Sequence, residues 1–145
     1  MYIIERVIKM DFIYERKINY YETDRMGIVH HSNYIRFLEE ARCEMLCQAG
    51  IPYSSFEEKG IMIPVLGVNC SFKHHVTFND IILIKPYVKE FNGVRLTMGY
   101  TITDKETGNV VLTGETKHCF TDGNLKPVRL QNQLPEFYEK FVELK

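Results

Sequence analysis

The chain has 145 residues, with 18 lysines and arginines against 19 acidic residues, so its formal net charge is −1. That length is enough for one domain with a full core, and a hydrophobic share of 45% with a charged share of 26% excludes disordered and fibrous classes. The near-neutral balance disfavours nucleic acid as the main partner, because binding phosphates needs clustered cations. The longest purely apolar run has four residues, so no membrane span is expected.

The N-terminal segment and the cysteines indicate a cytoplasmic protein. Charged residues interrupt residues 1–10, which leaves no apolar block for secretion. Met10 is a second candidate start, so we expect residues 1–10 to be a dispensable extension. The four cysteines are Cys43, Cys47, Cys70 and Cys119. They show no Cys-x-x-Cys spacing, and we expect free thiols in a reducing compartment.

The first half of the chain predicts one strand and one long helix. Residues 11–22 are rich in β-branched and aromatic types, which predicts a strand followed by an ordered loop. A helix is expected over residues 33–49, with Ser32 or Asn33 as its cap and Gly50 at its end. On a helical wheel its apolar residues form one stripe, made of Tyr34, Phe37, Leu38, Ala41, Met45 and Ala49.

The second half predicts an antiparallel sheet and a closing helix. Strands are expected at residues 66–72, 81–88, 94–103 and 110–120, and a helix at residues 133–144. Residues 53–60 are a variable stretch with no assigned element. Pro86 indicates an edge or a bulge in its strand, and Pro135 suits the first turn of the last helix. Polar turn residues at 105–109 join two strands as a long hairpin.

This order of elements predicts one α+β domain over residues 1–145, in which one antiparallel β-sheet wraps around a long central α-helix. In such a fold one face of the sheet and the two edge strands remain exposed to solvent unless something else packs against them. A second copy of the chain is the simplest cover, so we expect a homodimer or a homotetramer.

Several common catalytic motifs are missing from the sequence. There is no Gly-x-Ser-x-Gly, no Gly-x-x-x-x-Gly-Lys, no Gly-x-Gly-x-x-Gly and no His-Glu-x-x-His. These absences disfavour a common serine hydrolase, a nucleotide triphosphatase and a zinc protease. The pairs His30-His31 and His74-His75 lack a third ligand at a suitable spacing, so no metal site is expected.

The segment over residues 20–34 is the main candidate for a functional site. It sets Asp24 on a loop, then Gly27, and then the start of the long helix. Free N–H groups at a helix start carry partial positive charge and can hold a carbonyl oxygen as it becomes an oxyanion. A carboxylate one short loop away completes a site for acyl transfer without a serine. The alternative is that Asp24 only ties down the loop and the histidines are polar surface.

This segment resembles the active-site signature of the 4-hydroxybenzoyl-CoA thioesterase family of hotdog-fold proteins, most closely its YbgC-type acyl-CoA thioesterase branch. The motif of that branch is Tyr-x-x-Thr-Asp-x-x-Gly-Val-Val-Tyr-His-x-x-Tyr. A sequence similar to Phe-x-Glu-x-Ala-Arg follows it along the helix. The matching residues here are Tyr21, Thr23, Asp24, Gly27, Ile28, Val29, His31, Asn33, Tyr34, Phe37, Glu40, Ala41 and Arg42. The order of elements fits from about residue 11 to residue 130, and residues 72–80 resemble the family's strand-turn segment.

The resemblance implies a hotdog fold and a cytoplasmic enzyme that hydrolyses an acyl- or aroyl-CoA to the free acid and CoA, without a cofactor. Asp24 falls on the family's catalytic carboxylate, acting as nucleophile or general base. The backbone N–H at His31 polarises the thioester carbonyl, and the His31 side chain either orients Asp24 or the water, or takes no part. Gly27, Ile28, Val29 and Tyr34 are the implied substrate-binding residues.

Two departures from the branch concern the acyl pocket. Position 30 is His where the branch usually has Tyr, and Glu22 stands where a second Asp is common. The acyl group therefore stays open between short aliphatic, long aliphatic and aromatic. Two rival functions also stay open, a hotdog hydratase or dehydratase and a non-catalytic acyl-thioester binding protein that contacts acyl carrier protein.

For several other residues the sequence allows either a functional role or an ordinary structural or surface role. Lys73, His74, Lys117, Lys126 and Arg129 are candidates for holding the CoA phosphates, or are ordinary surface charge. Cys43 and Cys47 share a helix face and suit a packing contact or a subunit surface, and Arg42 suits a solvated face or a subunit contact.

Overall fold

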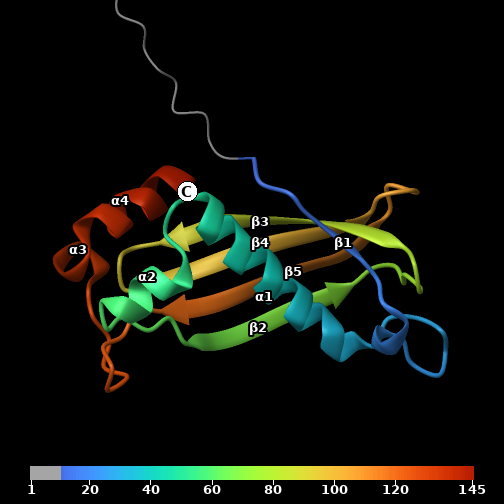
Figure 1. Cartoon of the computed structure of the whole chain (residues 1–145), viewed down its shortest axis with the longest axis horizontal. Helices are drawn as coiled ribbons and strands as arrows, with labels where there is room; N and C mark the ends of the chain where they lie inside the picture. Colours follow the sequence, from blue (N-terminus) through green and yellow to red (C-terminus); the bar gives the residue numbers. More distant parts are fainter. Residues whose placement is uncertain (1–10) are drawn as a thin grey trace, which may run out of the picture.

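Five antiparallel strands form one sheet in the order β1-β3-β4-β5-β2, and the long helix α1 crosses one face of it (Figure 1). This computed structural model describes residues 11–145, so the expected extension over residues 1–10 lies outside the described residues. The elements are β1 (Tyr14–Lys17), η1 (Tyr20–Glu22), α1 (His31–Gln48), α2 (Tyr53–Glu58), β2 (Val65–Phe72), β3 (Ile81–Phe91), β4 (Arg95–Asp104), β5 (Val110–Cys119), α3 (Leu130–Gln133) and α4 (Pro135–Leu144). The expected α+β fold, with one antiparallel sheet and a long helix, is confirmed.

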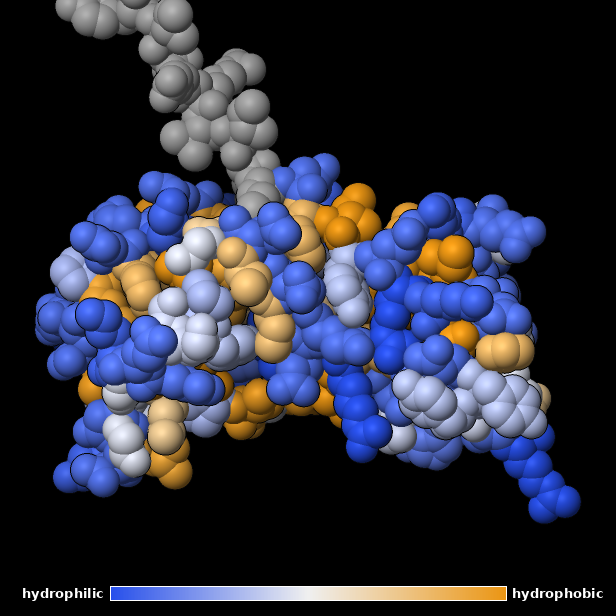
Figure 2. Space-filling model, in the orientation of Figure 1, coloured by the Kyte–Doolittle hydropathy of each residue, from blue (hydrophilic) through white to orange (hydrophobic). Residues whose placement is uncertain are grey.

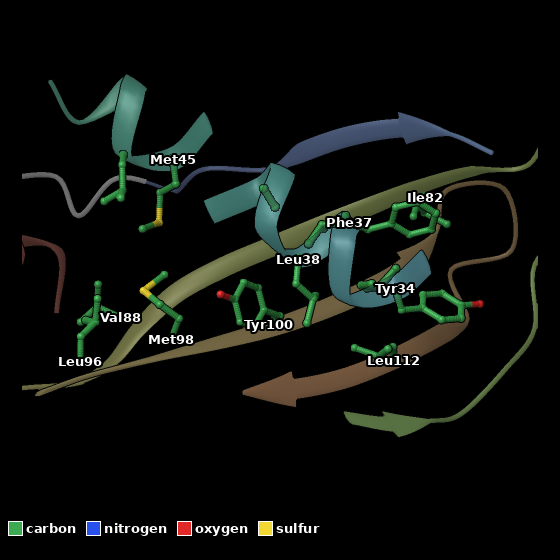
Figure 3. Packing of buried hydrophobic residues seen from close by; sticks show 14 of the residues in the cluster. Tyr34, Phe37, Leu38, Met45, Ile82, Val88, Leu96, Met98, Tyr100 and Leu112 are labelled. Carbon is green, nitrogen blue, oxygen red and sulfur yellow. The ribbon is translucent and has the colours of Figure 1, made fainter. Parts of the chain in front are cut away.

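The apolar stripe of α1 packs against the sheet as the wheel predicts. Tyr34, Phe37, Leu38, Ala41 and Met45 are all buried. Figure 3 shows the larger of these side chains directed at sheet residues such as Tyr100 and Leu112. Burying this face gives α1 most of its stability, because tertiary packing outweighs intrinsic helix propensity.

The start of α1 differs from the expectation by two residues. The cap is His30, rather than Ser32 or Asn33, and its Nδ1 accepts a hydrogen bond from the Ser32 backbone N–H at 3.2 Å. Histidine is an uncommon cap, which is why the usual serine and asparagine preference pointed too far along the chain. The two extra residues place His31 in the first turn of the helix.

The predicted strand over residues 11–22 is too long. Only Tyr14–Lys17 pair with β3, and the chain then turns into η1. Glu22 causes this turn, because its Oε1 accepts the Asn19 backbone N–H at 2.8 Å. The variable stretch expected at residues 53–60 contains the short helix α2, and the expected C-terminal helix is split into α3 and α4 with Pro135 at the first position of α4.

The sheet has unequal edges. Pro86 lies in β3 beyond the Tyr14↔Ile84 pair, where β1 no longer covers that side of the strand, and the register shift of β3 falls later, between Val88 and Glu90. The edge placement that Pro86 indicated is therefore confirmed. At the other edge, apolar side chains of β2 stay exposed, and Figure 2 shows hydrophobic atoms at the surface along the lower margin, where β2 runs in Figure 1.

A polar network lies inside the protein, between α1, α2 and the sheet. Arg42 donates from Nε to the Tyr53 hydroxyl at 2.8 Å and from Nη1 to the Tyr100 hydroxyl at 3.0 Å. The Tyr100 hydroxyl bonds Thr116 Oγ1 at 2.6 Å, and His118 Nε2 bonds the same oxygen at 2.7 Å. Arg42 is only 6% exposed, so the expectation of a solvated face is wrong. Its position next to the apolar stripe lets the long side chain reach two buried phenols.

Across residues 11–145, no helix combines the length and apolar character needed to cross a membrane. The four cysteines are all free, with Cys47 exposed, Cys43 and Cys70 partly exposed and Cys119 buried. Free thiols match the expectation from their spacing.

Candidate active site

A tight turn over residues 24–27 presents Asp24 at the surface of the loop before α1. The Asp24 N–H donates to the Ile28 carbonyl and the Gly27 N–H donates to the Asp24 carbonyl, each at 2.9 Å. Thr23 and Val29 form a bridge that closes the turn. Gly27 has a φ of 81°, a conformation that side chains with a Cβ rarely adopt, which explains the glycine at this position.

The Asp24 carboxylate has one oxygen engaged and one free. Its Oδ1 accepts the Met26 backbone N–H at 2.7 Å, which orients the carboxylate. Among the described residues, none hydrogen-bonds to Oδ2. The side chain is partly exposed, so this second oxygen can meet a ligand or a water molecule.

The first turn of α1 leaves one backbone donor unused. The neighbouring N–H groups are engaged, since His30 N–H donates to the Glu22 carbonyl at 2.9 Å and Asn33 N–H to the His30 carbonyl at 3.0 Å. Ser32 N–H bonds the His30 side chain. The His31 N–H donates to no acceptor within residues 11–145. It lies at the N-terminal, positive end of an 18-residue helix. This donor is available to a developing negative charge.

A cavity of about 460 Å³ joins these groups. Its wall includes Asp24 and His31 together with Ile28, Val29 and Tyr34. Five of the six site residues expected from the sequence therefore line one cavity. Gly27 is absent from the lining and contributes through the turn that positions Asp24.

The far side of the cavity comes from the end of β2 and the loop after it. Phe72, Lys73, His74 and His75 line it, and the Phe72 ring centroid is 5.6 Å from that of Tyr34. Of the five basic candidates, only Lys73 and His74 reach this cavity. Lys117 lines a separate hollow near Arg95, and Lys126 and Arg129 line neither.

A partly buried ion-pair cluster fastens the Asp24 loop to the rest of the protein. Arg16 of β1 bonds Glu22 through Nη1 at 2.5 Å and Glu40 of α1 through Nε at 2.7 Å. The Arg16 guanidinium also lies over the Phe37 ring, 4.1 Å from its centroid. The side chain of Glu22 is 4% exposed and that of Glu40 is 38% exposed. The role of Arg16 was missed, because only the folded chain brings β1, the loop and α1 together.

Replacing Glu22 by Gln is expected to lower the free energy of unfolding by about 2 kcal/mol. The largely buried Arg16 then keeps only one ion-pair partner, the more exposed Glu40. Gln keeps an acceptor for the Asn19 N–H, so the turn itself is retained. Chemical denaturation measures the effect. The matched control is Glu40→Gln, which removes the more exposed partner and should cost under 1 kcal/mol. Equal losses in both variants would contradict the anchoring role of Glu22.

The expectation on metal ligands concerns the histidine pairs. Among residues 11–145, no three His, Cys, Asp or Glu side chains gather as ligands for an ion. His74 and His75 have ring centroids 5.2 Å apart at the cavity rim, and His30 and His31 have centroids 4.2 Å apart at the start of α1.

The sequence and the fold are similar to those of known proteins. Residues 18–143 match the sequence model of a family described as the thioesterase-like superfamily. The crystal structure of the DHNA-CoA thioesterase of Staphylococcus aureus has a TM-score of 0.86 and 30% identity, covering 90% of this chain and 88% of that one. The long-chain acyl-CoA thioesterase FadM of Escherichia coli is 25% identical over 128 residues, which are 88% of this chain and 96% of FadM.

A third similarity concerns the fold alone. A Staphylococcus aureus protein solved in complex with CoA has a TM-score of 0.78 and 16% identity, covering 92% of this chain and 87% of that one. The overall fold is thus shared with a protein that was solved in complex with CoA.

Proposed function

The chain belongs to the thioesterase-like superfamily, and from this premise we propose that it hydrolyses the thioester of an acyl- or aroyl-CoA, with Asp24 as the catalytic carboxylate. The hotdog fold and the thioester-hydrolase class expected from the signature are both confirmed. We further propose that the chain belongs to the YbgC-type branch, on the spacing from Tyr21 to Tyr34.

One observation carries the proposal. Asp24, whose Oδ2 is free, and His31, whose backbone N–H is unused, line the same cavity. A carboxylate that acts as nucleophile or base and a backbone donor for the oxyanion together suit hydrolysis of a thioester. They face a wall of apolar residues, Ile28, Val29 and Phe72, that can receive an acyl group.

The chemistry follows from these two groups. The thioester carbonyl oxygen accepts the His31 N–H, and the positive end of α1 stabilises the negative charge that develops on it. Asp24 then attacks the carbonyl carbon and the thiolate leaves, which gives a mixed anhydride that water hydrolyses to the free acid and the restored carboxylate, or Asp24 removes a proton from the attacking water. The departing thiolate has a conjugate acid of pKa roughly 8.5 in the cysteine reference, so no strong general acid is needed.

The same residues serve either route, and neither route requires a cofactor. The His31 imidazole also lines the cavity and is exposed, which suits a role in orienting the water. Hydratase chemistry on the acyl chain is disfavoured, since it requires an acid and a base beyond the carbonyl rather than at it.

Lys73 and His74 suit the CoA end of the substrate. Coenzyme A carries phosphates, which cationic side chains bind. Both residues line the cavity and follow Phe72 directly in the chain. We assign the CoA entrance to this rim and the acyl group to the wall around Tyr34.

We also propose that residues 1–145 act as a single domain and that the chain forms a homodimer or a homotetramer. The exposed apolar residues of the β2 edge support this. Val65, Leu66, Val68 and Phe72 are between 42% and 55% exposed. An uncovered strand edge of this kind pairs readily with another chain.

The experiment is a thiol-release assay of the full chain with a panel of aliphatic and aromatic acyl-CoA thioesters. At least one of them should be hydrolysed with CoA and free acid formed in equal amounts. The same acyl groups on acyl carrier protein form the second panel. If the protein binds these thioesters but releases thiol from none, the enzyme proposal fails and the acyl-thioester binding protein takes its place.

A further inference from the structure

Tyr34 has an unusual position within the cavity. It follows His31 by three residues, so both side chains lie on the same side of the first turns of α1. Helical side chains tilt toward the N-terminus, which directs Tyr34 toward the free His31 N–H rather than away from it. The ring is held between Phe37 and Phe72, at centroid distances of 5.8 and 5.6 Å, and the residue is only 4% exposed.

The Tyr34 residue is buried, but its hydroxyl is not among the fully enclosed, unpartnered polar atoms of residues 11–145, which are His118 Nδ1 and Gln131 Oε1. The hydroxyl therefore stays accessible, and within these residues it has no hydrogen-bond partner. Buried tyrosine hydroxyls usually find one, and two others in this protein do. The Tyr53 hydroxyl accepts from Arg42, and the Tyr100 hydroxyl bonds both Arg42 and Thr116. In Figure 3 the Tyr34 hydroxyl points away from Tyr100 and Leu38. Tyr34 belongs to the lining of the cavity, so its accessible hydroxyl can bond water or a ligand that fills the cavity.

The protonation state of the Tyr34 hydroxyl suits a hydrogen-bond donor. Burial raises the pKa of Tyr34 to about 12, so the phenol keeps its proton at any pH at which the protein is assayed. The wall beside it is apolar, formed by Ile28, Val29 and Phe72. Tyr34 therefore adds a hydroxyl beside these apolar side chains, and a hydroxyl placed there can discriminate between acyl groups through one hydrogen bond.

We infer that the Tyr34 hydroxyl is a specificity-determining group, which hydrogen-bonds an oxygen carried by the acyl group beyond the thioester carbonyl. The inference rests on the proposed function, since it assigns the acyl group to the wall around Tyr34. It selects acyl groups with a hydroxyl or carboxyl oxygen over the same groups without it. The hydrogen bond from Tyr34 affects which substrate is preferred. It does not take part in the chemical step, which uses Asp24 and His31.

The test uses matched pairs of CoA thioesters that differ by one oxygen, such as 4-hydroxybenzoyl and benzoyl, and 3-hydroxybutyryl and butyryl. Wild-type protein should show a higher kcat/KM for the oxygenated member of at least one pair. Tyr34→Phe should reduce that preference, measured as the ratio of the two kcat/KM values, about tenfold, because one neutral hydrogen bond to the extra oxygen is lost while the ring remains. A purely structural role of Tyr34 would instead lower both members together.

The matched control is Tyr87→Phe, which removes a tyrosine hydroxyl from β3, outside the cavity, and should leave every preference unchanged. If wild type hydrolyses the thioesters but Tyr34→Phe keeps the wild-type preference in every pair, this inference is overturned and the proposed function stands. If wild type hydrolyses no thioester at all, the proposed function fails and the inference fails with it.

Discussion

Replacing Asp24 by Asn should reduce kcat for thioester hydrolysis by about a thousandfold, the loss typical of removing a catalytic acid or base. Asn is nearly the same size but has no negative charge, so it can neither attack the carbonyl nor take a proton from water. Its side-chain oxygen still accepts the Met26 N–H, so the turn over residues 24–27 is retained. Thiol release with the best substrate of the panel measures the change.

The control is Asp104→Asn, because Asp104 holds its own turn in the same way. Its Oδ1 accepts the Glu106 backbone N–H at 3.0 Å, two residues on, as Asp24 does for Met26. Asp104 is absent from the cavity, so this variant should keep wild-type kcat. An Asp24→Asn protein as active as wild type would show that Asp24 only ties down the loop.

The parts of the fold that follow one periodic pattern could be predicted from the sequence. The stripe of α1 places its own side chains, because a core face repeats at the period of its element. Elements decided by single contacts could not be predicted. β1 stops early because Glu22 bonds the Asn19 N–H, and α1 starts early because His30 acts as its cap.

The site divides in the same way. Asp24, His31 and Tyr34 lie within eleven residues, so one sequence segment shows them together. Phe72 ends β2 and Lys73 begins the loop after it, and the place of Phe72 beside Tyr34 depends on strand pairing across the sheet. The anchoring of Glu22 by Arg16 and the burial of Arg42 are both long-range contacts between charged or phenolic groups, for which no local pattern exists.

The pH dependence of folding should reveal the buried network around His118. Burial, and then the charge of Arg42, lower the pKa of His118 from 6.5 to about 4. The residue is 1% exposed, and its Nδ1 has no partner among the described residues, so a proton there would have no acceptor. The folded protein therefore holds His118 neutral over a range in which the unfolded chain takes up a proton.

The sign follows from that difference in proton uptake. Stability from this group is complete above about pH 6.5 and is lost as the pH falls toward 4, because only the unfolded state gains a proton in between. The free energy of unfolding should fall by about 3 kcal/mol more in wild type than in His118→Gln between pH 7 and pH 4. Denaturant titrations at several pH values measure both proteins.

The comparison isolates His118 because the carboxylates that also titrate below pH 6 are common to both proteins. Gln has no titrating group, yet its amide can still bond Thr116 Oγ1, which is the partner of His118 Nε2 at 2.7 Å. The variant should therefore unfold at a similar denaturant concentration to wild type at pH 7 and at a higher one at pH 4. Parallel curves for the two proteins across this range would mean that His118 takes up its proton as readily in the folded state as in the unfolded one.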